Sequence, residues 1–257
     1  MSGNTPPIDP ASAGIRPPGV AAPRPLGWGR FLLQFVSVIL AYCLASAPPV
    51  LFFGMDSALG LGLSAVTSMA AGLFVAWLWL RSDRAVAEAW DLSLPASWPG
   101  TLGIAVASAI GIQLWFQLCA WLAHLAGLPA VEAGLVIKHV TESALNLVFW
   151  VVAVGWFVAG FGEELMWRGF LLDRLTRLPG IQGRAWLAVT LQATVFGLPH
   201  IYEGGASGII VTGSIGLFFG WLRLRLRGNL WALVIAHALV DTASFLAAYV
   251  TTVYGQG

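Results

Sequence analysis

Seven long apolar stretches constrain the fold of this 257-residue chain more than any other feature. A helix needs about 20 mainly apolar residues to cross the hydrocarbon of a bilayer, and most of the stretches reach that length. They lie at residues 31–53, 58–80, 101–126, 145–166, 185–201, 207–222 and 230–252. The sequence therefore predicts an all-α polytopic membrane helix bundle with about seven transmembrane helices, of which the fifth and sixth are short.

Composition excludes a soluble protein and several classes of partner. Apolar residues make up 58% of the chain and charged residues 10%, against about 25% charged residues in soluble domains. A net charge of +1 gives no reason to expect a nucleic-acid partner. Cys43 and Cys119 both lie within apolar runs, so neither a disulfide framework nor a cysteine metal site is expected.

Basic residues predict the orientation in the membrane. With the N-terminus in the cytoplasm, twelve of the 13 Lys and Arg residues fall on the inside and only Lys138 falls outside. Loops on the cytoplasmic side carry such an excess of Lys and Arg. We therefore expect an integral protein of a bacterial plasma membrane, with its N-terminus in the cytoplasm and its C-terminus outside.

The chain divides into three parts by composition. Residues 1–29 hold half of the 14 prolines and predict a disordered, Pro-rich cytoplasmic tail. Residues 30–144 predict the N-terminal transmembrane helices. Residues 145–252 predict a transmembrane core, and this core holds the ionisable residues described next.

Two adjacent carboxylates lie at the end of the fourth apolar stretch. A charge at the bilayer centre costs about 2.5–3.5 kcal/mol, so such residues are expected to form ion pairs or to have a functional role. Glu164 and Arg168 are four residues apart and share a helix face, which predicts an ion pair. Glu163 points about 100° away and is free to face a cavity. The alternative is that both carboxylates lie at a solvated helix end.

Two further groups place ionisable residues on later helices. Phe196 and His200 close the fifth stretch, where Pro199 restricts the backbone and favours a local break. His237 and Asp241 share one face of the seventh, an apolar helix. Plainer readings are an interfacial histidine at 200 and a structural hydrogen bond between His237 and Asp241. Together, however, these groups supply the carboxylates and imidazoles that a hydrolytic site needs.

These residues resemble the CPBP family of intramembrane proteases, which includes type II CAAX prenyl endopeptidases and bacteriocin-processing and self-immunity proteins. That family has the patterns Glu-Glu-x-x-x-Arg, Phe-x-x-x-His and His-x-x-x-Asn or Asp, in this order. The matching residues here are Glu163, Glu164, Arg168, Phe196, His200, His237 and Asp241. At the last of these positions Asn is common in the family, and an ionised acid cannot donate a hydrogen bond as Asn can.

The resemblance implies an intramembrane endopeptidase whose catalytic core spans residues 145–252 and whose substrates are membrane proteins or peptides. Glu163 would be the general base that activates a water together with His200. His237 would stabilise the oxyanion. Asp241 would orient His237 or share in stabilising the oxyanion. Glu164, Arg168 and Phe196 would support the site.

Several alternatives remain at this point. We favour a metal-independent site, and the alternative is a zinc ion held by Glu163, His200 and His237, with water as a fourth ligand. Intramembrane carboxylates and imidazoles also serve transporters and proton relays. A non-catalytic immunity or scaffold protein is a third possibility. The depths of the site residues along their helices slightly favour a site that opens to the cytoplasm.

Overall fold

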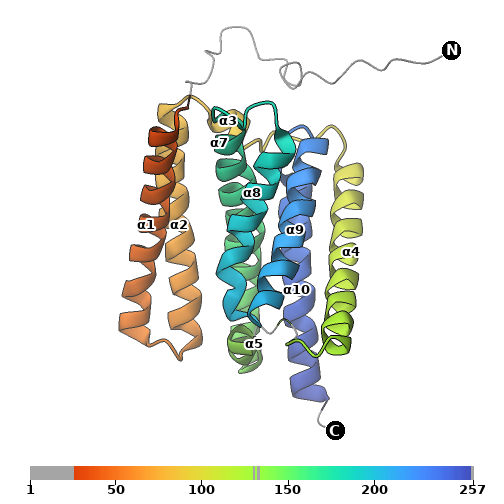
Figure 1. Cartoon of the computed structure of the whole chain (residues 1–257). Coiled ribbons are helices and arrows are strands. Elements are labelled where there is room, and N and C mark those ends of the chain that lie inside the picture. The colour runs from red at the N-terminus through yellow and green to blue at the C-terminus, as the bar shows by residue number, and fades with distance from the viewer. Residues whose placement is uncertain (1–25, 130, 132–133, 256–257) are drawn as a thin grey trace, which may run out of the picture.

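The computed structural model describes residues 26–129, 131 and 134–255, and within them it contains helices and no strand. The elements are named α1–α10, η2 for a π-helix and η3 for a 3₁₀ helix. In chain order they are α1 (Trp28–Phe53), α2 (Ala58–Ser82), α3 (Val86–Ala89), α4 (Trp98–Leu125), α5 (Gly134–Thr141), α6 (Ala144–Phe149), η2 (Trp150–Leu171), α7 (Leu172–Thr176), α8 (Ala185–Gly197), η3 (Leu198–Tyr202), α9 (Ala206–Arg225) and α10 (Trp231–Tyr254). Figure 1 shows these helices side by side in one bundle. The predicted all-α fold is confirmed.

Six helices are long and apolar enough to cross a membrane. They are Trp28–Phe53, Ala58–Ser82, Trp98–Leu125, Ala144–Thr176, Ala206–Arg225 and Trp231–Tyr254. The fifth predicted span, at 185–201, is instead the 13-residue α8 followed by η3. It is helical as expected, but α8 is too short to cross a bilayer unaided. These helices make the chain an integral membrane protein with six candidate spans, against about seven predicted.

Local sequence fixes where several helices begin and end. Ser57, Ser97 and Ser143 are N-caps whose hydroxyls accept a hydrogen bond from the backbone N–H three residues later. Gly54 ends α1 with a φ of 85°, a conformation that favours glycine. The predicted tail at 1–29 lies outside the described residues except for its last four, where Leu26 is buried and Trp28 begins α1.

The central element is one continuous helix over Ala144–Thr176, formed by α6, η2 and α7. Its middle section, Trp150–Leu171, is wound as a π-helix, in which each N–H bonds to the carbonyl five residues earlier. Nothing in the apolar pattern predicts this winding. Single-turn π-bulges inside α-helices occur frequently at functional sites, and this section is a longer stretch of the same winding. Both carboxylates of the predicted site, Glu163 and Glu164, lie on this section.

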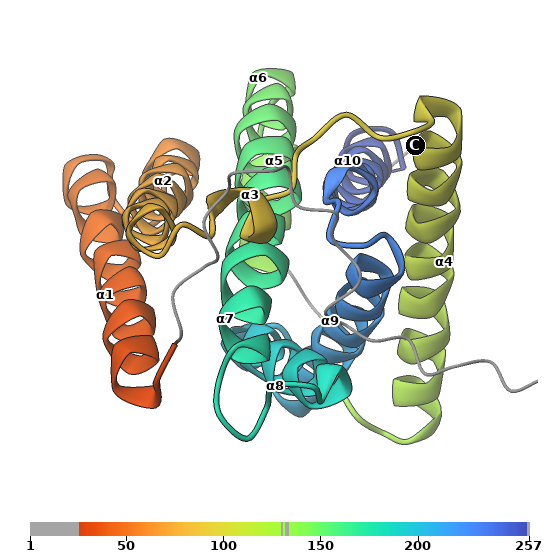
Figure 2. The ribbon, with the colours of Figure 1, turned by 90° about the horizontal axis from the view of Figure 1, so that it is seen from above.

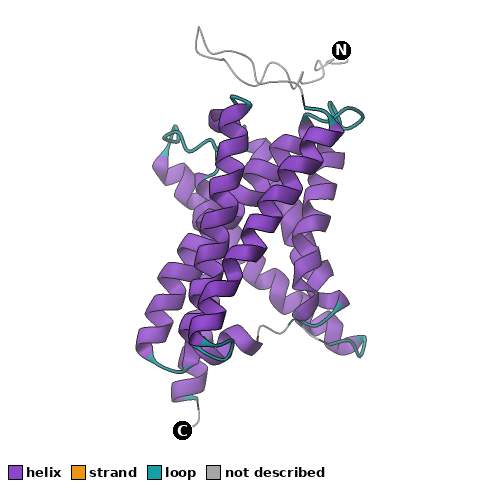
Figure 3. Cartoon of the chain, turned by 90° about the vertical axis from the view of Figure 1, so that its left-hand side faces the viewer, coloured by secondary structure: helices purple, strands orange, loops and turns teal. Residues whose placement is uncertain are grey.

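The other helices surround this central helix. Viewed from above, α1 and α2 lie on one side of it, and α10 and α4 lie on the other (Figure 2). The helices α8 and α9 pack against each other, and α10 packs against both η2 and α4. The bundle carries its connecting loops at its two ends (Figure 3).

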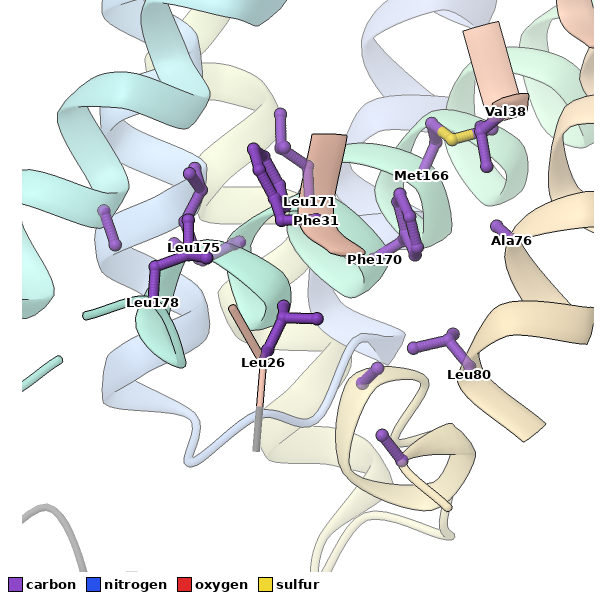
Figure 4. Close-up of a cluster of buried hydrophobic side chains, with 14 of the residues drawn as sticks. Leu26, Phe31, Val38, Ala76, Leu80, Met166, Phe170, Leu171, Leu175 and Leu178 are labelled. Atoms are coloured by element: carbon purple, nitrogen blue, oxygen red, sulfur yellow. The ribbon is translucent and has the colours of Figure 1, made fainter. Parts of the chain in front are cut away.

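A large apolar cluster joins α1 and α2 to the central helix. Figure 4 shows Phe31 and Val38 of α1, Leu80 of α2 and Met166 and Phe170 of η2 directed into the same interior region. All five side chains are buried. This cluster fixes η2 on the side that faces away from α10, and so sets the direction in which its carboxylates point.

Ion pairs hold the helix ends together beside α3. Asp83 is almost fully buried and accepts hydrogen bonds from Arg30 and Gln34 of α1 and from Arg174 of α7. Arg177 bonds to Asp173 at 2.7 Å, and this ion pair raises the pKa of the Arg177 guanidinium. Buried charges need such partners to offset the cost of desolvation.

Two glycines let α10 approach η2 closely. A Cβ atom on Gly160 would lie 2.7 Å from the Cβ of Ala238 and 3.0 Å from the carbonyl oxygen of Val234. On Gly155, a Cβ would lie 3.4 Å from the Cβ of Asp241. Only small residues allow two helix backbones to come this close. The approach brings the polar face of α10 against the carboxylates of η2.

We predict that Gly160→Ala lowers the free energy of unfolding by about 1–3 kcal/mol, because the added methyl group overpacks the contact with Ala238. Thermal unfolding in detergent measures this change. Gly103→Ala on α4 is the matched control, since a Cβ there meets nothing within 4 Å. Alanine at Gly103 should leave stability unchanged or raise it by up to about 1 kcal/mol. Equal effects at both positions would contradict the packing argument.

Candidate active site

Glu164 is the polar centre of the contact between η2 and α10. Its side chain is fully buried, and its Oε1 accepts a hydrogen bond from Nη1 of Arg168 at 2.9 Å. The same oxygen accepts a second bond from Nδ1 of His237 at 2.8 Å. The ion pair with Arg168 was predicted from spacing. The bond to His237, which comes from a different helix, was not.

Arg168 is held by aromatic rings as well as by this carboxylate. Its guanidinium carbon lies 4.1 Å from the ring centroid of Phe196 and 5.1 Å from that of Phe219. An arginine is attracted to the face of an aromatic ring, most strongly where water is excluded. Phe196 therefore supports the site by packing on the Arg168 cation, which joins α8 and α9 to η2.

His200 lies on η3, just after the end of α8. Its Nδ1 is 3.0 Å from the carbonyl oxygen of Phe196. A carbonyl only accepts, so Nδ1 carries the proton and donates, and in the neutral ring Nε2 keeps its lone pair. The ring also packs on Phe196 and Tyr202, with centroids 5.3 Å and 6.4 Å away. The break expected at Pro199 is present as this 3₁₀ turn.

His237 and Asp241 are on the same face of α10, but they are not hydrogen-bonded to each other. His237 bonds to Glu164 instead, and its ring lies 5.7 Å from that of Phe219. The structural His237–Asp241 hydrogen bond considered from the sequence is therefore wrong. Asp241 faces Gly155 of η2 and lines the space beside it.

That space is a cavity of about 800 Å³, and it brings the predicted catalytic side chains together. Its wall contains Glu163, His200, His237 and Asp241, which come from η2, η3 and α10. Glu164 and Arg168 are behind the wall rather than in it. The structure thus divides the two adjacent carboxylates as helical geometry indicates, with Glu163 towards the cavity and Glu164 paired.

The structure adds Glu203 to the cavity wall, a residue that the sequence did not single out. It follows η3 directly, before Gly204 and Gly205, whose φ angles of 101° and 67° turn the chain back into α9. Partial burial raises the pKa of the Glu203 carboxyl above its ordinary value. An acidic residue three positions after His200 was the signal in the sequence, but the fold of this turn decides where it points.

The donor set does not fit a zinc ion in this arrangement. Zinc needs at least three His, Cys, Asp or Glu side chains that converge on one point. Over the part of the chain that the structure describes, no three such side chains come together in this way. We derive no step through a metal held by Glu163, His200 and His237.

Comparison with known protein families gives a match, which covers the C-terminal part of the chain. Residues 145–243 match the family described as type II CAAX prenyl endopeptidase Rce1-like. The matched segment contains η2, α8, α9 and the part of α10 that carries His237 and Asp241. The chain thus carries an Rce1-like type II CAAX prenyl endopeptidase (CPBP) family domain at these residues. No curated protein and no solved structure matches the chain. The match to this family over residues 145–243 suggests an intramembrane protease.

Proposed function

We propose that this protein is an intramembrane endopeptidase that hydrolyses peptide bonds of membrane-associated proteins or peptides. The observation that carries the proposal is the shared cavity wall of Glu163, His200, His237 and Asp241, four residues from three separate elements. The family match at residues 145–243 supports the same reaction class. A cavity of about 800 Å³ has room for several residues of an extended peptide.

In the proposed reaction, Glu163 and His200 activate the attacking water. The lone pair on Nε2 of His200 accepts a hydrogen bond from the water and positions it, because Nδ1 is already committed to Phe196. Glu163 takes a proton from this water as its oxygen attacks the carbonyl carbon of the scissile bond. The same carboxyl group then gives the proton to the leaving nitrogen as the C–N bond breaks.

His237 and Asp241 act on the other side of the carbonyl. The Glu164 carboxylate on Nδ1 orients the His237 ring and stabilises an imidazolium that can donate from Nε2 to the oxyanion. Glu164 is therefore a positioning residue for His237, and Arg168 positions Glu164 in turn. Asp241, one turn further along α10, orients the substrate or shares in oxyanion binding.

The test compares the membrane proteins of three strains by sequencing newly formed N-termini. One strain lacks the gene, one carries the wild-type gene, and one carries Glu163→Gln. We expect a set of cleavage products that appears only with the wild type, and this set also identifies the substrates. If Glu163→Gln restores the cellular function without cleavage, the protein acts as a scaffold. Ion flux in proteoliposomes without proteolysis would instead indicate a transporter.

We predict that Asp241→Asn keeps the rate of cleavage within about tenfold of the wild type, that is within about 1.4 kcal/mol in activation free energy. Asparagine retains an acceptor and adds an N–H donor, which suits contact with an oxyanion. Asp241→Leu keeps the same number of side-chain heavy atoms and the same branching, lacks both polar groups and should lose more. Cleavage of one identified substrate by the purified variants measures both rates. Equal losses of rate in the two variants would contradict this prediction, because they would mean that the reaction requires a negative charge at position 241.

A further inference from the structure

The cavity lies in the half of the bundle away from α3. Figure 1 shows α3 at one end of the bundle and α5 at the other. Lining residues include Val136 and Ile137 of α5 and Ser207 in the first turn of α9. The helix α9 runs for 20 residues, or about 30 Å, from there to the α3 end. From α4, the wall takes only residues from Ile112 onward, in the second half of that helix.

Between the cavity and the α3 end, the bundle is filled. An apolar cluster of buried residues occupies this region, with members on η2, α9 and α10. Some members, such as Ile215 and Phe219, line the cavity, whereas Leu165, Leu222, Leu230 and Leu233 are buried and do not line it. The buried Arg168–Glu164 pair lies at the same level. The four leucines form a plug, and neither they nor any arginine of the loops beside α3 is among the residues that line the cavity.

The α3 end is also covered on its outer side. Nε1 of Trp90 donates to the carbonyl oxygen of Leu165 at 2.8 Å, and Nη2 of Arg223 donates to that of Ala89 at 3.1 Å. The segment after α3 binds the loop before α10, since the N–H of Leu230 donates to the oxygen of Asp91 at 3.1 Å. These bonds fasten the segment from α3 to Asp91 over the ends of η2, α9 and α10.

At the opposite end, residues of the cavity wall reach the surface. Tyr202 is 69% exposed and Ile210 is 68% exposed, although both line the cavity. Leu128, which follows α4, is 58% exposed and lines it too. A closed internal void would bury such residues, so Tyr202 and Leu128, which lie in the connections at the α5 end, mark its rim there. Trp115, in the middle of α4, is 40% exposed and also lines the cavity, so the wall is open between helices as well. The chamber opens at the α5 end.

Charge distinguishes these two ends. The basic residues of the loops and helix ends beside α3 are Arg30, Arg81, Arg84, Arg174, Arg177, Arg184, Arg223, Arg225 and Arg227. Among the described residues, the α5 end has only Lys138. The side of a membrane protein that carries the excess of Lys and Arg is the cytoplasmic side.

We propose that the chamber opens away from the cytoplasm, and that it takes extended peptide segments which membrane proteins present on the outer side of the membrane. The cleavage itself rests on the function proposed above, whereas the direction of opening rests on the plug, the rim and the arginines. The depths of the site residues, taken from the sequence, favoured the cytoplasmic side. Those depths were taken one helix at a time, so they could not show the plug between the cavity and α3.

Thiol labelling tests the direction without any need for activity. Cys119 lines the chamber, and Cys43 is the other cysteine of the chain. In a Cys43→Ala chain, Cys119 therefore reports on the chamber. We expect a charged, membrane-impermeant methanethiosulfonate to label it at least about tenfold faster in intact cells than in inside-out vesicles, because charge hinders crossing of the hydrocarbon.

Two single-cysteine variants in a Cys43→Ala/Cys119→Ala chain calibrate the sides. Ala206→Cys, at the start of α9, should label from outside, and Arg225→Cys, at its end, should label from inside. Faster labelling of Cys119 from inside, or no labelling from either side, would overturn the proposal. Labelling from outside combined with full cleavage by Glu163→Gln would instead overturn the proposed chemistry and leave the direction standing.

Discussion

Glu163→Gln is expected to lower the rate of peptide-bond hydrolysis by roughly 10²–10⁴-fold, the usual contribution of a general acid–base. The amide has nearly the same size and shape as the carboxylate but cannot take a proton from water. Because Glu163 lines the cavity and the buried ion pair is made by Glu164, this change leaves the helix contact intact. Cleavage of an identified substrate by purified protein in proteoliposomes measures the loss, and thermal unfolding should remain unchanged.

Glu203→Gln is the matched control for this prediction. It removes another carboxylate from the wall of the same cavity, and we assign Glu203 no role in the proposed chemistry. The rate should stay within about tenfold of the wild type, a change below about 1.4 kcal/mol in activation free energy. If Glu203→Gln abolishes cleavage while Glu163→Gln retains it, the general base has been assigned to the wrong carboxylate.

The features that the sequence predicted well are those that depend on one helix at a time. Apolar length identified the long helices, and i, i+4 spacing identified the pair of Glu164 with Arg168. Spacing also indicated that Glu163 and Glu164 point in different directions, which the cavity wall bears out. Within a helix, a regular number of residues per turn relates position to direction without knowledge of the rest of the fold.

Features that depend on two helices could not be predicted in this way. The bond from His237 to Glu164 joins residues 73 positions apart, so spacing along α10 pointed to Asp241 as the partner. The bond forms because glycines at 155 and 160 let α10 approach η2, and their role is visible only with both helices in place. The π-helical winding of η2 and the plug beside the cavity are likewise products of packing.

Arg168→Met should lower the free energy of unfolding by about 3–5 kcal/mol, as removal of one partner from a buried ion pair generally does. Methionine keeps much of the length of the side chain but leaves the fully buried Glu164 without its cation. It also removes the charge that packs on Phe196 and Phe219. Thermal unfolding in a fixed detergent measures the change. Arg225→Met, which removes an exposed arginine packed on Trp221, should cost less than about 1 kcal/mol.

A double variant separates the ion pair from the packing. Glu164→Gln/Arg168→Met leaves no buried charge without a partner, so it should be more stable than the sum of the two single losses implies. It should nevertheless be slow in cleavage, because a neutral glutamine no longer stabilises charge on His237. Recovery of stability without recovery of rate would establish that Glu164 and Arg168 serve the reaction by positioning His237. If the two losses simply add, the charges at 164 and 168 contribute independently and the coupling through Oε1 is wrong.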